Sequence, residues 1–342
     1  MKALVYEGPK NIKIKQVNDP ILHKGEVIIK VKATGICGSD VHGYLGITGR
    51  RTPPMIMGHE FSGDISEIGE GVIKFSVGDR VTVQPLIFCG DCEYCKQGLT
   101  NLCINKKYYG SMDTNGSMAE FISVPQKLIY KLPDLLNYLE GAMIEPLAIA
   151  YCAVNKVPNI EGKNVFVVGA GTIGLLVLQV VKSKNPTKIF TSDTDENRLG
   201  LAKKMGADFT INPIKDNLKD IINRETKNEG IDIAFEVVGI SATVQQAMSV
   251  LKIKGTCVWV GNSEKMINLN MQEIVTKELN IIGTYGCTHI EFGNSIKFLV
   301  EKDLDLNSMI SKVVLLNEGP EMFKKLAEGK SNLIKVILTD ST

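Results

Sequence analysis

Two groups of residues in this sequence have the types and spacing of metal ligands. The first is a run of four cysteines, Cys89, Cys92, Cys95 and Cys103, spaced C-x2-C-x2-C-x7-C. Four thiolates in one loop suit a tetrahedral Zn²⁺ ion bound at about 2.3 Å. An iron–sulfur cluster is the competing interpretation, but ferredoxin-type runs place the fourth cysteine three residues on and before proline, whereas Cys103 precedes Ile104. We therefore predict a closed, structural zinc site.

The second group is spread over three separate segments. Cys37 lies in "GICGSDVHGY", His59 and Glu60 lie in "MGHEFSG", and Glu145 lies in "GAMIEPLA". Catalytic zinc keeps three protein ligands and one open position, and cysteine with histidine is a known combination. Glu60 and Glu145 compete for the third place. Adjacent side chains in a strand point opposite ways, so His59 and Glu60 can share an ion only where the backbone is irregular. Both carboxylates remain candidates, including exchange between them during turnover.

A glycine-rich turn predicts a dinucleotide site. Gly169, Gly171 and Gly174 form G-x-G-x-x-G, with Thr172 and Ile173 before the last glycine, directly after the apolar run "NVFVV". The first glycine permits the tight turn, the second lets the backbone approach a pyrophosphate, and the third lets helix and strand pack closely. The phosphates would meet the positive end of the following helix.

A carboxylate further along favours NAD over NADP. Asp193 ends the apolar run "KIFTSD", where it can accept hydrogen bonds from the ribose hydroxyls and repel a 2′-phosphate. Its alternative role is the N-cap of the helix that begins "ENRLG". Arg198 weakens the preference for NAD, because a guanidinium there is able to meet a phosphate.

The elements that must position these residues fall into two patterns. Residues 1–130 carry short β-like runs separated by Gly and Pro, as expected of a small barrel or sandwich. From Asn164 onward, apolar strands alternate with helical stretches, which predicts βαβ units and a doubly wound parallel sheet, so the fold class is α/β. After Gly286 the pattern is helix, strand, helix, strand. We place the boundaries near residues 150 and 285.

Composition excludes several classes of protein. The 342 residues are 44% hydrophobic, with 39 basic and 38 acidic side chains, so nucleic acid is not an expected partner. The start "MKALVYEGPK" lacks a signal-peptide pattern, and no apolar run approaches the roughly 18 residues of a membrane span. We expect a cytoplasmic protein without a membrane partner. Eight cysteines in such a chain favour reduced thiols over disulfides.

These motifs together resemble one family. "GICGSDVHGY", "MGHEFSG", "GDRV", the four-cysteine loop, "GSMAEFISVP", "GAMIEPLA", "VVGAGTIG" and "SDTDENRLGLAKKMGA" follow the order and spacing of the zinc-containing medium-chain dehydrogenases/reductases. The similarity is to the sorbitol, butanediol, polyol-phosphate and threonine dehydrogenase branch and runs essentially end to end. It implies a GroES-like catalytic domain, residues 1–149 completed by 286–342, and a Rossmann NAD-binding domain, residues 150–285. It also implies a homodimer or homotetramer, with "LNIIGTY" as a candidate pairing strand.

The resemblance implies hydride transfer between a secondary alcohol and NAD, giving the ketone. The expected substrate is a polyol, vicinal diol or sugar alcohol, whose hydroxyl a catalytic zinc would acidify. Ser39 matches the proton-relay hydroxyl of the family, and His42 would carry the proton on towards solvent; an ordinary imidazole titrates near ~6.5. Tyr44 and Glu145 would hold further substrate hydroxyls. Ser39 as a helix cap and His42 as a surface residue are the structural alternatives.

Other activities stay open at this stage. Arg50 and Arg51 in "GITGRRTPP" would be able to fork onto the phosphate of a polyol phosphate. Threonine oxidation at the 3-position is a further alternative within the branch. A nucleotide-binding relative that has lost its reaction is disfavoured, because Ser39 and His42 are both present.

Overall fold

The structure is a computed structural model that describes residues 1–329 and 332–340. The chain divides into two compact units. Unit 1 is Met1–Glu145 together with Cys287–Thr342, and unit 2 is Pro146–Gly286. Unit 1 is therefore built from two stretches of chain that are separated in sequence by the whole of unit 2.

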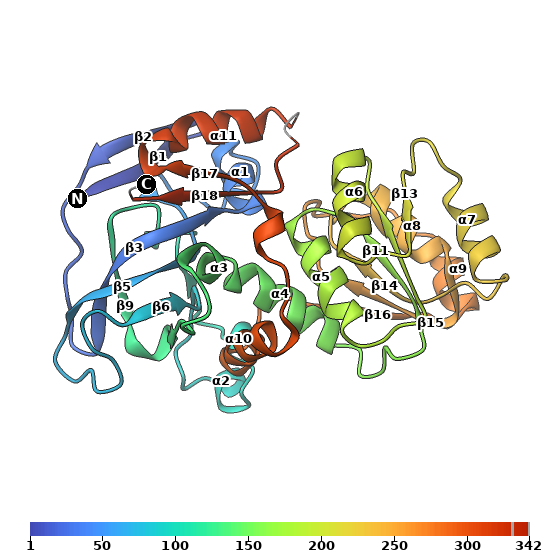
Figure 1. Ribbon diagram of the computed structural model, residues 1–342, viewed down its shortest axis with the longest axis horizontal. Helices are drawn as coiled ribbons and strands as arrows, with labels where there is room; N and C mark the ends of the chain where they lie inside the picture. The colour runs from blue at the N-terminus through green and yellow to red at the C-terminus, as the bar shows by residue number, and fades with distance from the viewer. Residues whose placement is uncertain (330–331, 341–342) are drawn as a thin grey trace. The chain divides into compact units, whose positions relative to one another are not determined.

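Unit 1 is rich in β-structure (Figure 1). Its large sheet has the order β10-β6-β5-β3-β18-β17, and β9 also pairs with β3. The strands of this sheet are β3 (Glu26–Ile36), β5 (Glu60–Ile68), β6 (Arg80–Val83), β9 (Phe121–Pro125), β10 (Ile129–Lys131), β17 (Ile310–Leu315) and β18 (Lys335–Thr339). A second sheet has the order β2-β1-β4, from β1 (Lys2–Gly8), β2 (Asn11–Gln16) and β4 (Met55–Ile56), and a two-stranded sheet joins β7 (Leu86–Ile87) and β8 (Lys107–Tyr108).

Short helices connect these strands. The α-helices of unit 1 are α1 (Gly38–Tyr44), α2 (Glu93–Lys96), α3 (Tyr138–Ala142), α10 (His289–Lys302) and α11 (Gly319–Ala327). The 3₁₀ turns are η1 (Thr100–Leu102), η2 (Gln126–Leu128), η3 (Asn307–Met309) and η4 (Leu316–Glu318). The order predicted after Gly286, helix, strand, helix, strand, is confirmed by α10, β17, α11 and β18.

β3 is an inner strand of the large sheet, and it ends directly before Cys37. It is buried along most of its length, and Val27, Ile29 and Val31 share a core cluster with Phe61 and Ile65 of β5. Such burial on a central strand suits the β-branched run "VIIKV".

The register of three strands brings distant residues together at one end of the large sheet. Gly35 near the end of β3 pairs with Glu60, the first residue of β5. Ile36 pairs with Val336, which follows Lys335 at the start of β18. Figure 1 shows α1 directly after this end of β3. The start of α1, the start of β5 and the start of β18 therefore meet.

Unit 2 has one six-stranded parallel sheet of order β13-β12-β11-β14-β15-β16. Its strands are β11 (Asn164–Val168), β12 (Lys188–Ser192), β13 (Phe209–Ile211), β14 (Ile231–Glu236), β15 (Leu251–Trp259) and β16 (Asn280–Gly283). Its helices are α5 (Thr172–Lys182), α6 (Glu196–Met205), α7 (Leu218–Glu225), α8 (Ser241–Ser249) and α9 (Met271–Thr276), and α4 (Ile144–Asn155) leads into the unit. Counted along the chain, the order is 3-2-1-4-5-6, that of a Rossmann sheet. The predicted fold class is confirmed.

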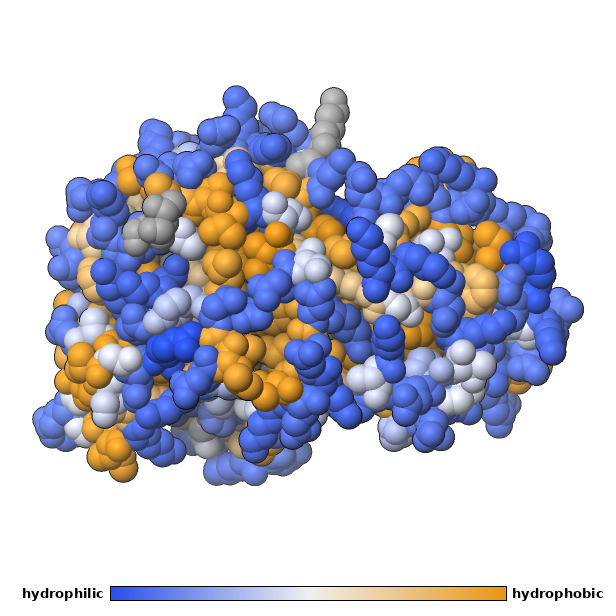
Figure 2. Space-filling model, viewed as in Figure 1, coloured by the Kyte–Doolittle hydropathy of each residue, from blue (hydrophilic) through white to orange (hydrophobic). Residues whose placement is uncertain are grey.

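No helix within the described residues is both long and apolar enough to cross a bilayer. Figure 2 shows hydrophilic residues over most of the viewed surface.

Candidate metal centres and dinucleotide site

The first candidate metal centre lies where β3, β5 and β18 meet. Ligand atoms of Cys37, His59 and Glu60 all lie within 4.8 Å of one another. Cys37 caps α1 directly after β3, and His59 directly precedes β5. Gly58 has a φ of +98°, and a Cβ there would lie 2.8 Å from Met118 Cγ. This left-handed glycine is the irregular backbone that lets His59 and Glu60 approach the same point.

Asp40 holds both Cys37 and His59. Its side chain is fully buried; Oδ2 accepts the backbone N–H of Cys37 at 3.1 Å, and Oδ1 lies 3.5 Å from Nδ1 of His59. With Nδ1 facing the carboxylate, Nε2 is the ring atom left to bind a metal. Burial opposes ionisation of Asp40, but the positive charges of His59 and Arg51 hold its pKa at about 2. Burial also disfavours a charged His59, yet the Asp40 carboxylate raises the pKa of that ring well above its usual value. The same negative charge favours a metal cation there.

The two candidate carboxylates have different partners. Glu60 Oε2 accepts a hydrogen bond from Lys335 Nζ at 2.6 Å, and both side chains are at most 2% exposed. Glu145 lies outside the cluster of Cys37, His59 and Glu60. Its Oε1 accepts from the hydroxyl of Tyr108 at 2.7 Å, and burial raises its pKa to about 7.

Tyr108 is a site residue that the sequence did not reveal. Its ring packs edge-on against His59, with centroids 5.5 Å apart, while its hydroxyl holds Glu145. The residue belongs to the two-residue strand β8, which is too short to give a periodic signal.

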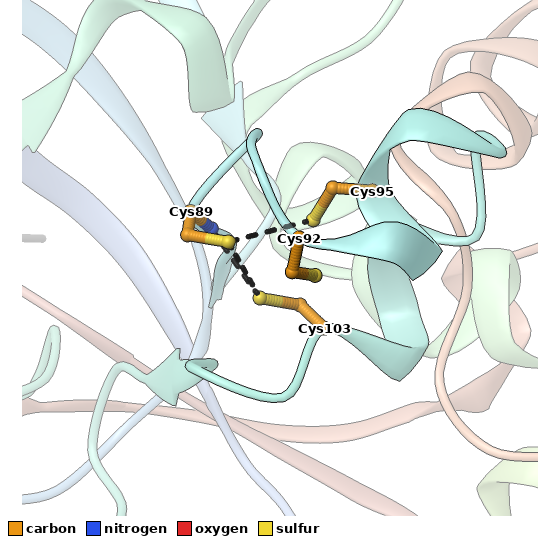
Figure 3. Close-up of side chains that lie close together, drawn as sticks. All are labelled: Cys89, Cys92, Cys95 and Cys103. Atoms are coloured by element: carbon orange, nitrogen blue, oxygen red, sulfur yellow. Dashed lines mark hydrogen bonds between the residues drawn. The ribbon is translucent and has the colours of Figure 1, made fainter.

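The four cysteines form the second candidate metal centre (Figure 3). Their sulfur atoms all lie within 4.8 Å of one another; Cys89 Sγ is 3.5 Å from Cys103 Sγ and 3.9 Å from Cys95 Sγ. A tetrahedral zinc with bonds of about 2.3 Å requires sulfur atoms about 3.8 Å apart. Hydrogen bonds from the backbone of Cys95 and Ile104 lower the pKa of Cys92 to about 6, which favours a thiolate at that position, whereas burial raises the pKa of Cys95 to about 12. The spacing and the chemistry fit zinc.

The glycine-rich turn joins β11 to α5. Gly169 has a φ of +102°, and a Cβ at Gly174 would lie 1.9 Å from Gly169 O, so this glycine permits close packing of helix on strand. A Cβ at Gly171, the N-cap of α5, would meet nothing within 4 Å. The open side of Gly171 and the N-terminus of an 11-residue helix, which begins at Thr172 and Ile173, suit a pyrophosphate.

Asp193 sits beside this turn and supports it. Its Oδ2 accepts the N–H of Ala170 at 2.8 Å, and its Oδ1 accepts the N–H of Asp195 at 2.9 Å. The helix cap is Asp195, whose side chain accepts from Asn197 and Arg198, so the capping alternative for Asp193 is wrong. A carboxylate has about four acceptor positions, which leaves capacity for ribose hydroxyls. Arg198 Nη1 lies 3.8 Å from Asp193 Oδ2.

Comparisons with known proteins agree with this geometry. A family model for the alcohol dehydrogenase GroES-like domain matches residues 23–134, and one for zinc-binding dehydrogenases matches residues 172–301. D-arabitol-phosphate dehydrogenase of Enterococcus avium is 37% identical over 92% of this chain and 89% of its own length. The chain belongs to the zinc-binding alcohol dehydrogenase family. Sorbitol dehydrogenase of Bacillus subtilis (strain 168) is 32% identical to this dehydrogenase over 99% of the chain and 97% of its own length.

Solved structures of other dehydrogenases carry dinucleotides. A zinc-binding dehydrogenase of Sinorhizobium meliloti 1021 bound to NADP has a TM-score of 0.91 and 30% identity, covering 99% of this chain and 98% of its own. An alcohol dehydrogenase of Escherichia coli CFT073 complexed with NADH has a TM-score of 0.92 and 30% identity, covering 99% of both chains.

The three predicted residues of α1 in this dehydrogenase have different surroundings. Ser39 is exposed and His42 is partly exposed. Cys37, not Ser39, caps the helix, so the capping alternative for Ser39 is wrong. Tyr44 is 7% exposed and packs in the core of unit 1, with its ring 5.6 Å from that of Phe323. We therefore assign Tyr44 to packing rather than to substrate binding.

Arg50 and Arg51 also have different surroundings. Arg50 is exposed, but Arg51 is buried, with Nη2 3.0 Å from Asp40 Oδ1. Of the two arginines offered as phosphate ligands, only Arg50 is exposed, because Arg51 is paired with Asp40 inside unit 1.

Proposed function

We propose that this dehydrogenase transfers a hydride from a secondary alcohol of a polyol, vicinal diol or sugar alcohol to NAD, giving the ketone. The observation that carries the proposal is the buried cluster of Cys37, His59 and Glu60 in a chain that also has the dinucleotide-binding turn. Sulfur, imidazole and carboxylate are the donor set of a catalytic zinc site.

Two zinc ions per subunit fit the residues present. When bound at Cys37 and His59, zinc supplies a Lewis acid that makes a secondary alcohol acidic near neutral pH. Glu60 is the third ligand in this proposal, since its second carboxylate oxygen is not needed by Lys335. Glu145 orients a substrate hydroxyl or a water molecule, and Tyr108 fixes its carboxylate. The four-cysteine loop holds the structural ion.

Ser39 and His42 carry the proton of the substrate hydroxyl to solvent in this proposal. Ser39 is exposed at the first turn of α1, two residues from Cys37, and accepts the proton that the substrate hydroxyl gives up. His42, one helical turn further along, passes the proton to solvent. The two side chains are placed for this task by the same short helix that presents Cys37.

NAD is the proposed cofactor. Asp193 places a negative charge next to the Gly169–Gly171 turn, and that charge opposes a 2′-phosphate. Arg198 favours NADP, but its charge is partly offset by the neighbouring Asp193. Parallel assays with NAD and NADP test this step, and a preference for NADP would reassign Arg198 as a phosphate ligand.

A polyol phosphate is the second candidate substrate. The similarity to the D-arabitol-phosphate dehydrogenase of Enterococcus avium favours it, and the exposed Arg50 offers one guanidinium to a phosphate. The Arg50→Gln variant distinguishes the two candidates. It raises KM for a phosphorylated polyol and leaves KM for the unphosphorylated one unchanged.

The experiment that tests the proposed function is a substrate panel. Purified enzyme is assayed for NADH formation with polyols, diols, polyol phosphates and threonine. Turnover of a secondary alcohol that disappears in Cys37→Ala supports the proposal. Zinc-loaded enzyme that binds NAD yet oxidises no member of the panel would favour a non-catalytic relative.

We also propose a homodimer or homotetramer that works in the cytoplasm. β16 is an edge strand of the parallel sheet, and the segment of chain before it carries exposed apolar residues, among them Met266, Met271 and Val275. Pairing of this edge with a second copy would cover backbone groups and apolar side chains together. None of the eight cysteines, all within the described residues, forms a disulfide, which suits a reducing compartment.

A further inference from the structure

A buried ion pair lies behind the candidate catalytic metal centre. Asp40 has no exposed side-chain surface, and the side chain of Arg51 is 4% exposed. A buried carboxylate is stable only when it is paired and hydrogen-bonded. Asp40 meets this requirement through three partners, the N–H of Cys37, the ring of His59 and the guanidinium of Arg51.

Arg51 uses both terminal nitrogens of its guanidinium, whereas its buried Nε has no hydrogen-bond partner. Nη2 donates to Asp40 Oδ1 at 3.0 Å and lies 3.5 Å from Ser39 Oγ, while Nη1 donates to Ser111 Oγ at 3.1 Å. A lysine carries the same charge as a compact ammonium on a flexible stem and cannot reproduce this fixed fork. The arrangement therefore requires a guanidinium and not only a positive charge.

Backbone hydrogen bonds hold the residues on both sides of Arg51. Met112 N donates to Arg50 O at 2.6 Å, and Thr52 N donates to Met112 O at 3.1 Å, so backbone bonds fix both sides of Arg51. The stem of Arg51 crosses α1 at Gly43, where a Cβ would lie 2.7 Å from Arg51 Cγ. The side chain of Arg51 can pass this close to α1 and reach Asp40 because Gly43 has no side chain.

We propose that Arg51 is a positioning residue of the metal centre, which fixes the Asp40 carboxylate and through it the orientation of Cys37 and His59. The inference rests on the proposed function, because it assumes that these two residues bind zinc. Partners that orient metal ligands typically change metal affinity by about 10- to 100-fold when they are removed. Arg51 acts on the metal ligands through Asp40, and it also contacts Ser39.

The test measures zinc affinity by competition with a chelator, site by site. Arg51→Gln should weaken zinc binding at the Cys37 site by about 10-fold or more and leave the four-cysteine site unchanged. Arg51→Lys should recover only part of the loss, because charge without the fork does not fix Asp40. Arg50→Gln, the exposed neighbour, should keep wild-type zinc affinity. Equal affinities in wild type and Arg51→Gln would overturn the proposal.

Two further readouts separate positioning from a general structural role. With Co²⁺ in place of zinc, the visible spectrum of the Cys37 site should change in Arg51→Gln but not in Arg50→Gln. If Arg51→Gln does not fold, Ser111→Ala decides, because it keeps Arg51 and removes the acceptor of Nη1 together with a long 3.4 Å hydrogen bond from Ser111 Oγ to Arg50 O. It should weaken zinc binding several-fold at that site, and unchanged affinity and spectrum would refute the inference. Wild-type enzyme with no zinc at Cys37 would instead refute the proposed function.

Discussion

Replacing Lys335 by methionine tests which carboxylate binds the catalytic ion. Lys335 Nζ is 2.6 Å from Glu60 Oε2 and 3.3 Å from Ile36 O, and no more than 2% of either charged side chain is exposed. Methionine keeps most of the volume of the lysine stem and removes its charge. Glu60 is then a buried carboxylate without its cationic partner.

The size of the effect depends on whether zinc is bound. In metal-free protein, breaking a buried pair by removing one partner costs about 3–5 kcal/mol of unfolding free energy. If Glu60 is a zinc ligand, the bound ion compensates its charge and the loss is smaller in the loaded enzyme. Every 1.4 kcal/mol of difference between the two states corresponds to about tenfold tighter zinc binding in the variant. We expect Lys335→Met to bind zinc at this site at least roughly tenfold more tightly than wild type.

Urea unfolding of both metal states, with hydrogen exchange in β5 and β18, measures the loss. Lys312→Met is the matched control, since Lys312 is exposed on the neighbouring strand β17 and pairs with Val336. Such surface changes typically stay within about 0.5 kcal/mol. An equal loss for Lys335→Met with and without zinc would show that Glu60 is not a ligand and would favour Glu145.

Three further predictions concern other parts of the molecule. Cys92→Ala should lower the melting temperature and remove one zinc ion while kcat of the remaining folded enzyme at room temperature is preserved; loss of kcat at an unchanged melting temperature would contradict the structural role. Asp193→Ala loses the hydrogen bond to Ala170 N as well as the ribose contacts, so NADH titration should show about 10- to 100-fold weaker binding, and an unchanged affinity would refute the site. Burial and the charges of Lys74 and Lys127 lower the pKa of His289. His289 therefore becomes protonated at a lower pH in the folded state than in the unfolded chain. Stability should therefore fall as pH drops below ~6.5, and His289→Gln should flatten that slope in urea titrations at several pH values.

The parts of the fold that sequence predicted are those with local signals. The Rossmann sheet follows from apolar runs such as "NVFVV" alternating with helical stretches, and the observed strand order confirms it. The order of helices and strands after Gly286 was equally readable. The pairing of β3 with β18 was not, because these strands are about 300 residues apart and their register is set by packing in three dimensions.

The same distinction holds within the candidate site. The four cysteines and the glycine turn are contiguous, so their spacing alone indicates their chemistry. Lys335 and Tyr108 reach their carboxylate partners from distant segments, and no periodicity connects them. The sequence offered Arg50 and Arg51 alike as phosphate ligands, because nothing in it shows that Arg51 packs against α1 at Gly43. The burial of Tyr44 in the core of unit 1 was not readable either, because the side of a helix that faces the core depends on its neighbours.

We propose that Cys37, His59 and a carboxylate hold the zinc ion on which the reaction depends. The most direct measurement is the zinc content of freshly prepared enzyme and of Cys37→Ala, taken together with NADH formation from the best substrate of the panel. We expect two zinc ions per subunit in wild type, and one in the variant with loss of turnover. Full activity with a single zinc, held by the four cysteines, would contradict it.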